Sequence, residues 1–195
     1  MMIVMEYIAQ RVVERLLKYK LIEEENRELY CYSFQVVIER LIGFSALFFL
    51  SVLFKRTIET IVFVVFFSAI RRRSGGFHAR TYLLCFFGSI GLYSIYVLII
   101  FSWLEKNMFI NSLITIVSAM ILLVIGAVNH PNMAWNEEEF KKSKSITRWV
   151  VITELVCIIA GLGFGLPNKY ILFMSFGIIL SAVLLIAGKL IKQEV

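Results

Sequence analysis

Six long apolar runs dominate the sequence and restrict the choice of fold class. A helix needs roughly 20 apolar residues to cross a membrane, and five of the runs come close to that length. Hydrophobic residues make up 59% of the 195 positions, too many for one soluble core to bury without large exposed patches. We therefore predict an all-α, polytopic membrane helix bundle of about six transmembrane helices. The runs are Val36–Phe54, Ile58–Ile70, Thr81–Leu104, Met108–Val128, Trp149–Leu166 and Tyr170–Gly188.

The run Ile58–Ile70 is the doubtful span, because 13 residues give a helix only about 20 Å long. One alternative is a short span, accommodated by a locally thinner bilayer or by flanking arginines that snorkel. The other is a re-entrant segment that returns to the same side of the membrane. With six spans and a cytoplasmic N-terminus, 16 of the 20 basic residues lie inside, as the positive-inside rule requires. The charge pattern therefore predicts six spans with both termini in the cytoplasm.

The N-terminal segment predicts an amphipathic helix rather than a secretory signal. Its apolar stripe separates from its charged residues, so it either lies on the membrane surface or packs on the other helices. We expect one integral-membrane domain, with a helical region at 1–35, the bundle at 36–188 and a cytoplasmic tail at 189–195. The stripe is Val4, Ile8, Val12 and Leu16, flanked by Tyr7, Val13 and Leu17.

Composition excludes several function classes. Three cysteines spread over the chain argue against a disulfide scaffold, and no cysteine or histidine spacing matches a metal site. All fourteen acidic residues are Glu, which rules out chemistry that depends on Asp. The net charge of +6 comes from basic residues between apolar runs, so we expect no nucleic-acid partner. We also expect no metal and no cofactor.

One stretch, residues 71–85 with the sequence RRRSGGFHARTYLLC, gathers groups able to perform nucleophilic chemistry. Cys85 begins a span, where the helix N-terminus and nearby arginines favour a thiolate, and His78 has the ordinary pKa of a general base. On one straight helix the two would stand about 10 Å apart, so we expect Gly75 and Gly76 to turn the chain. The candidate catalytic residues are His78 and Cys85; the candidate binding or site-shaping residues are Arg71, Arg72, Arg73, Gly75, Gly76, Arg80 and Glu154.

Each of these features also has a plain structural interpretation. A cysteine in a membrane helix is commonly a small apolar filler, which is how we interpret Cys31 and Cys157. An arginine run is simply explained as a contact with anionic lipids. Glu154, about one turn into its span, either orients a histidine, receives a substrate cation or snorkels. The segment Asn129–Arg148 is a solvated loop or short helix with i,i+4 charge pairs, or a docking surface.

The motif of Arg73, Ser74-Gly75-Gly76-Phe77-His78-Ala79 and Thr81, with Cys85 seven residues after the histidine, resembles the signature of the accessory gene regulator B (AgrB) family. The segment with Pro131 and Asn132 resembles a second family pattern, although Met133–Trp135 departs from the Lys-Pro pair of many relatives. The resemblance implies a cysteine endopeptidase of the bacterial cell membrane that processes an AgrD-like propeptide into a cyclic quorum-sensing signal. It also implies His78 as base, Cys85 as nucleophile and a possible homodimer.

In that case a Cys or Ser of the peptide would attack the Cys85 thioester and close a thiolactone or lactone ring, and Arg71–Arg73 would hold an acidic tail.

Two other function classes stay open on the sequence alone. A small transporter or exporter without covalent catalysis agrees with six spans and with Glu154. A structural or lipid-binding membrane protein needs only the arginine run.

Overall fold

The structure, a computed structural model, describes residues 2–77, 79, 81–129 and 135–191, and every regular element in those ranges is helical. The predicted helical fold class is therefore confirmed. One isolated backbone bridge, between Gly75 and Val128, joins two connecting segments. The elements are α1 (Met2–Lys18), the 3₁₀ turn η1 (Glu24–Asn26), α2 (Arg27–Leu53), α3 (Thr57–Ser74), α4 (Tyr82–Ile95), the π-helical segment η2 (Tyr96–Ile100), α5 (Phe101–Lys106), α6 (Met108–Ile125), α7 (Glu137–Gly163) and α8 (Asn168–Leu190).

Five helices of the described chain are long and apolar enough to cross a membrane. They correspond to five of the six apolar runs, and α3 covers the sixth, doubtful one. Four of the 18 residues of α3 are charged, so it does not belong to this group. Its length of about 27 Å at 1.5 Å per residue nevertheless exceeds that of the apolar run alone, and the sixth span stays a prediction. The five are Glu24–Leu53, Tyr82–Lys106, Met108–Ile125, Glu137–Gly163 and Asn168–Leu190.

The chain divides into two compact units. The first unit comprises Met1–Leu50 and Ala79–Gly91, and the second comprises Ser51–His78 and Leu92–Val195. Helices α2 and α4 each contain a boundary between the units. The expected division of the chain at residues 36 and 189 stays a prediction.

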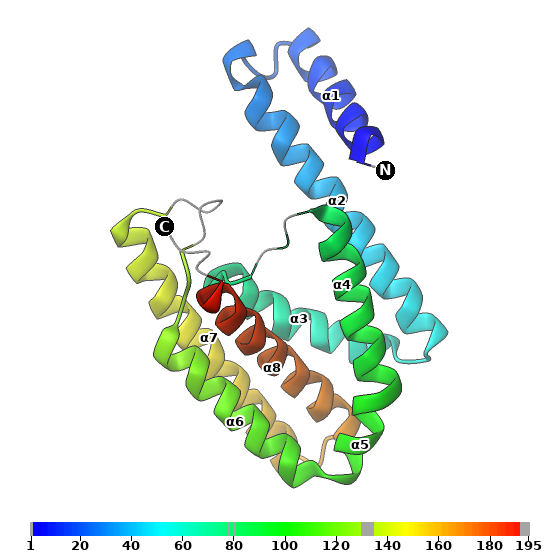
Figure 1. Ribbon diagram of the computed structural model, residues 1–195, viewed down its shortest axis with the longest axis vertical. Helices are drawn as coiled ribbons and strands as arrows, with labels where there is room; N and C mark the ends of the chain where they lie inside the picture. The colour runs from blue at the N-terminus through cyan, green and yellow to red at the C-terminus, as the bar shows by residue number, and fades with distance from the viewer. Residues whose placement is uncertain (1, 78, 80, 130–134, 192–195) are drawn as a thin grey trace. The chain divides into compact units, whose positions relative to one another are not determined.

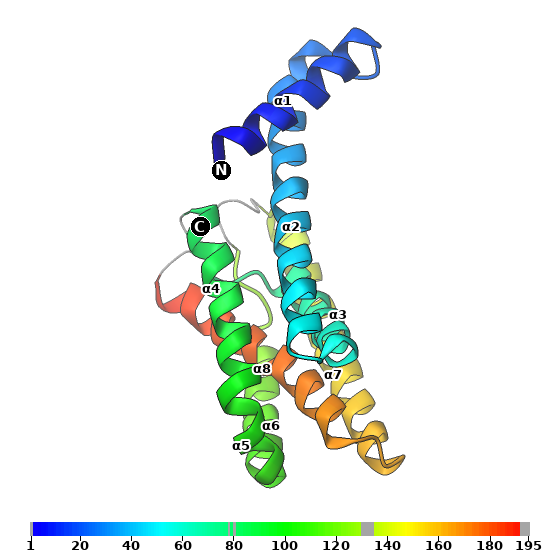
Figure 2. The same cartoon turned by 90° about the vertical axis from the view of Figure 1, so that its right-hand side faces the viewer.

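In the first unit, α1 lies beside the first half of α2 (Figures 1 and 2), and Glu14 lies 3.9 Å from Arg27. Met5, Ala9 and Val13 are almost fully buried, whereas Ile8 is 44% exposed. Of the predicted stripe and its flanking residues, Val13 is fully buried and Val12, Leu16 and Leu17 are half-buried, so the buried face is rotated slightly from the predicted line through Ile8. The helix itself was predicted correctly.

In the second unit, α8 packs against α3, α6 and α7 (Figure 1). Small residues bring the backbones together, as is common where membrane helices meet. A Cβ on Gly177 would lie 2.8 Å from the Cβ of Phe66. The core of this unit consists of Ile70, Ala119, Leu122, Val128, Val151, Ile158, Ile171, Ile178, Ala182 and Leu185.

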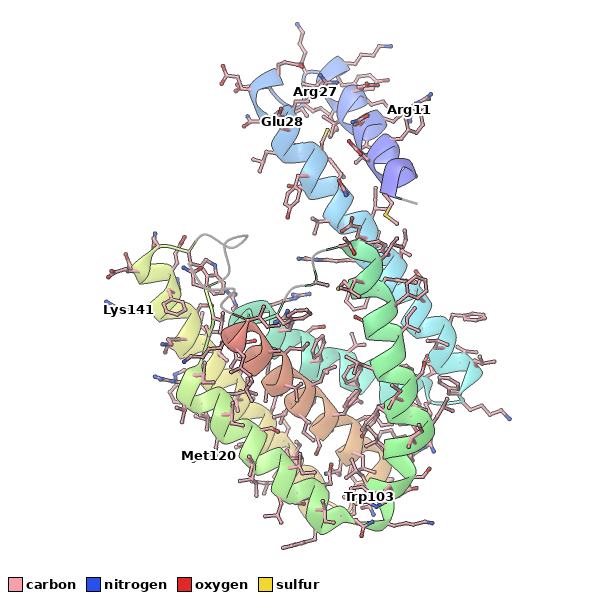
Figure 3. The ribbon with its side chains drawn as sticks, viewed as in Figure 1. Arg11, Arg27, Glu28, Trp103, Met120 and Lys141 are labelled. Atoms are coloured by element: carbon pink, nitrogen blue, oxygen red, sulfur yellow. The ribbon has the colours of Figure 1, made fainter. Side chains whose placement is uncertain are left out.

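Large apolar side chains also face outward. Trp103 on α5 is 53% exposed and Met120 on α6 is 57% exposed, and both point away from the helices around them (Figure 3). An apolar exterior of this kind agrees with a lipid environment, where outward-facing side chains need no polar cover.

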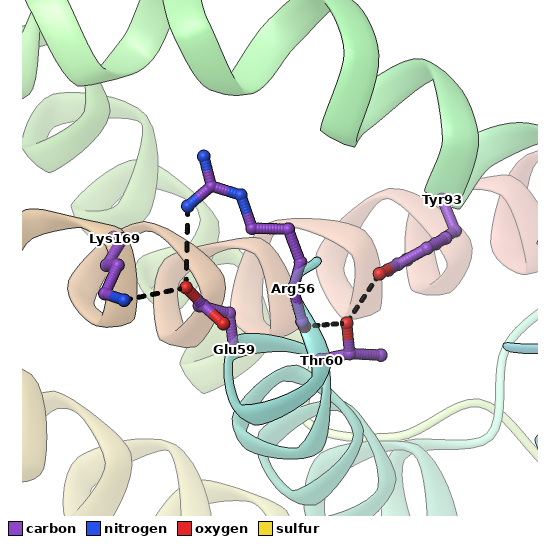
Figure 4. A network of polar contacts seen from close by, with 5 residues as sticks. All are labelled: Arg56, Glu59, Thr60, Tyr93 and Lys169. Carbon is purple, nitrogen blue, oxygen red and sulfur yellow. Dashed lines mark hydrogen bonds and ion pairs between the residues drawn. The ribbon is translucent and has the colours of Figure 1, made fainter. Parts of the chain in front are cut away.

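Polar contacts join three helices of the second unit (Figure 4). The buried Glu59 side chain lies 3.1 Å from Lys169 Nζ and 3.4 Å from Arg56 Nη1. The Thr60 hydroxyl donates to the Arg56 carbonyl at 2.6 Å and lies 2.5 Å from the Tyr93 hydroxyl. Because a threonine hydroxyl has one proton, Tyr93 must be the donor in the second contact. The starts of α3 and α8 are thereby tied to α4.

Candidate functional site

Helix α3 ends in the predicted glycine turn. Gly75 and Gly76 have φ angles of 64° and 100°, in the left-handed region that residues with a Cβ avoid. The Ser74 carbonyl accepts from the Val128 amide at 2.8 Å, and the Ser143 hydroxyl donates to the Arg73 carbonyl at 2.8 Å. These contacts satisfy carbonyls that a helix C-terminus leaves open.

The backbone after the turn is held from two sides. The Phe77 amide donates to the Leu184 carbonyl of α8 at 2.8 Å, and the Arg71 guanidinium donates to the Phe77 carbonyl. Arg71 thus has a hydrogen-bond partner in its own chain, and its predicted contact with a substrate tail stays a prediction. Arg72 and Arg73 are exposed. His78 and Arg80 lie outside the described residues.

Cys85 lies in the first turn of α4, where the sequence predicted a helix start. Its thiol is free and exposed. Thr81 begins this turn: its hydroxyl accepts from the Leu84 amide at 3.3 Å, and its carbonyl accepts from the Cys85 amide at 3.1 Å. In the same unit, the Tyr82 hydroxyl donates to the Glu39 carbonyl at 3.4 Å. The thiol thus lies where the partial positive charge of a helix N-terminus acts.

Both other cysteines were interpreted as apolar fillers, and the structure contradicts this interpretation for Cys157. Cys31 is partly buried, but Cys157 is exposed on α7. Cys157 therefore faces outward from an apolar helix and does not fill the core. The reason is that α7 buries a different face, through Val151 and Ile158, which a uniformly apolar run cannot reveal.

Glu154 does not snorkel. The residue is 6% exposed, and neither carboxyl oxygen has a hydrogen-bond partner. It lies on the inner face of α7 because it follows the buried Val151 by three residues and precedes Ile158 by four. Whether it orients a group or receives a cation stays a prediction.

The charged part of the polar segment is helical, which was one of its two predicted structures. Helix α7 begins at Glu137, so the charge cluster forms its first turns, and Lys141 lies 3.9 Å from Glu137 in the expected i,i+4 arrangement. Asn136 and Glu139 form a capping box: Asn136 Oδ1 accepts from the Glu139 amide at 2.8 Å, and Glu139 Oε2 accepts from the Asn136 amide at 3.0 Å. The spacing Asn-x-x-Glu is a known helix-start signal that the sequence analysis missed. Residues 130–134, which include His130, Pro131 and Asn132, lie outside the described chain.

Comparison with models of protein families shows to which family the chain belongs. Residues 8–185 match the family model of accessory gene regulator B. The chain belongs to the AgrB family. Comparisons with curated proteins and with solved structures give no match. AgrB membership implies a role in quorum-sensing peptide processing, and the five apolar helices indicate a membrane protein.

Proposed function

We propose that this AgrB-family chain is a membrane cysteine endopeptidase that cleaves an AgrD-like propeptide and promotes its cyclisation. The observation that carries the proposal is the exposed Cys85 thiol in the first turn of α4, seven residues after His78 in the motif that the family match covers. The Gly75–Gly76 turn between α3 and this motif supports it, because it separates the histidine from the end of α3.

In the proposed mechanism, His78 takes the Cys85 proton and the thiolate sulfur attacks a propeptide carbonyl carbon. The resulting tetrahedral intermediate breaks the carbon–nitrogen bond, and His78 gives its proton to the leaving amine. The C-terminal part of the propeptide departs, and the N-terminal part remains on Cys85 as a thioester. A Cys or Ser side chain of the bound peptide then attacks that thioester, which closes the ring and regenerates the Cys85 thiol.

The position of Cys85 suits this chemistry. The thiol lies in the first turn of a helix, near the partial positive charge of the helix N-terminus, and a peptide bound over the exposed thiol would keep water from the thioester. Thioester exchange keeps the acyl group reactive, so holding the peptide nucleophile close is enough to favour the ring. The membrane itself concentrates an amphipathic peptide near the enzyme.

Binding of the peptide tail is proposed for the exposed arginines. Arg72 and Arg73 follow the apolar part of α3 and are exposed, so they are available to an acidic tail, with Arg80 as a further basic group. The same residues are available to anionic lipid headgroups. Glu154 remains a candidate orienting group and the homodimer a candidate assembly.

The test uses the full chain in liposomes with a synthetic or co-expressed AgrD-like propeptide. We expect Cys85→Ser and His78→Ala to abolish cleavage, and Cys31→Ser and Cys157→Ser to retain it. Mass spectrometry of the wild type should detect the propeptide fragment as a thioester on Cys85. Full cleavage by Cys85→Ser would overturn the proposal, and peptide transport that survives Cys85 alkylation would favour an exporter.

A further inference from the structure

Helix α8 touches the glycine turn more closely than a side chain would allow. A Cβ on Gly188 would lie 2.5 Å from the Phe77 nitrogen and 2.6 Å from the Gly76 carbonyl carbon. Carbon atoms in contact prefer separations of about 3.5–4.0 Å. Any side chain at position 188 must therefore push the turn away from α8.

The absence of a side chain at Gly188 also leaves the Leu184 carbonyl accessible to a further hydrogen-bond donor. In a helix, a side chain covers the turn on the N-terminal side of its own Cα, and Gly188 lies one turn after Leu184. With no side chain at 188, the Leu184 carbonyl accepts the Phe77 amide at 2.8 Å. A carbonyl oxygen has two lone pairs, so it accepts this bond without leaving its own helix.

The turn is equally tight on its other side. A Cβ on Gly76 would lie 2.8 Å from both the Leu184 oxygen and Arg71 Nη1, and the Arg71 guanidinium donates to the Phe77 carbonyl. Both polar groups of Phe77 are thus fixed, one by α8 and the other by α3. The next residue in the chain is His78.

We propose that Gly188 is a positioning residue for the peptidase site: by admitting the Gly76–Phe77 backbone against α8, it holds the backbone that immediately precedes the proposed general base in the sequence. This inference rests on the proposed function. It gives α8 a part in the reaction that needs no side chain at position 188.

Two glycines provide matched controls for Gly188→Ala. Gly177 lies on the same face of α8, three turns earlier, and a Cβ there would lie 2.9 Å from the Phe67 nitrogen of α3. Gly177→Ala therefore introduces a similar clash without touching the glycine turn. Gly163→Ala adds a methyl to a helical glycine with nothing within 4 Å.

The first measurement needs no catalysis. Hydrogen exchange of the full chain in lipid nanodiscs should show the Phe77 amide exchanging about tenfold faster or more in Gly188→Ala, because its acceptor is lost. Gly177→Ala and Gly163→Ala should leave this amide as in the wild type. Unchanged exchange in Gly188→Ala would overturn the proposed contact.

The second measurement is propeptide cleavage by the same variants. We expect Gly188→Ala to lower kcat by about 100-fold, since small misplacements of a catalytic group cost that much, while KM stays close to the wild-type value. Normal kcat despite faster exchange, or an equal loss in Gly177→Ala, would overturn the positioning role.

A second variant covers the case in which Gly188→Ala fails to fold. Arg71→Met removes the donor to the Phe77 carbonyl from the other side and should produce the same faster exchange and lower kcat. If Cys85→Ser and His78→Ala cleave normally, the proposed function fails instead, and the exchange measurement still decides the Gly188 contact by itself.

Discussion

The Phe77 amide and the Leu184 carbonyl form a 2.8 Å hydrogen bond between the glycine turn and the last helix. The bond joins the motif that carries the proposed chemistry to a predominantly apolar helix. It depends on Gly188, one turn after Leu184, because only a residue without a side chain leaves that carbonyl open. The AgrB-family motif is thus held by residues far from it in the sequence.

The hydroxyl contact between Tyr93 and Thr60 gives a first prediction. Tyr93→Phe removes the donor at 2.5 Å but leaves the Thr60 proton bonded to the Arg56 carbonyl, so no donor is orphaned. We expect a loss of about 0.5–1.5 kcal/mol in the free energy of unfolding, measured by thermal unfolding in detergent. Tyr32→Phe, at a residue 60% exposed, is the control and should change nothing. An equal loss in both variants would show that the Tyr93–Thr60 hydrogen bond does not itself stabilise the bundle.

The capping box of α7 gives a second prediction. Asn136→Ala removes the acceptor of the Glu139 amide and should lower the free energy of unfolding by about 1 kcal/mol, the usual cost of losing an N-cap. Glu138→Ala, at a neighbouring exposed position, is the matched control. Helix content near residue 137, followed by hydrogen exchange, should fall only in the first variant. Unchanged exchange in Asn136→Ala would show that α7 starts without this cap.

The positions of the helices could be predicted from the sequence, whereas the buried face of each membrane helix could not. The apolar runs predicted the helices well, because composition alone decides whether a segment is stable in lipid. The Gly75–Gly76 turn was also predictable, since paired glycines have few other uses after an arginine-rich helix end. The inward face of each membrane helix was not predictable: Cys157 and Glu154 are only three residues apart, yet one faces out and the other in. A helix that is apolar all round has no moment to reveal its buried side.

The anchoring of the glycine turn shows a second limit. Arg71 looked like its neighbours Arg72 and Arg73, and nothing in the run distinguishes the one that binds the Phe77 carbonyl. Gly188 carries no functional group and lies in an apolar run. Their roles depend on contacts between segments distant in the sequence, which periodicity and spacing do not encode.

Glu154 gives a third prediction. Its carboxyl group is buried without a hydrogen-bond partner, and burying an uncompensated charge or polar group costs free energy. Replacing such a group by an apolar side chain of similar size is often stabilising by about 1 kcal/mol or more. We therefore expect Glu154→Leu to unfold at a higher temperature than the wild type, and Glu154→Ala to gain less because it leaves a cavity. A lower unfolding temperature for Glu154→Leu would show that the carboxyl group stabilises the bundle.

The membrane topology gives the last prediction, which turns on α3. If α3 crosses the membrane, the exposed Lys106 at the end of α5 faces the outside and Leu190, at the end of α8 and 77% exposed, faces the cytoplasm. In a background with all three native cysteines replaced by serine, Lys106→Cys should react with a membrane-impermeant maleimide on intact cells, because only externally exposed thiols meet it. Leu190→Cys should react only after the membrane is opened. If Lys106→Cys also needs an opened membrane, α3 does not cross, and the basic residues after it no longer follow the positive-inside rule.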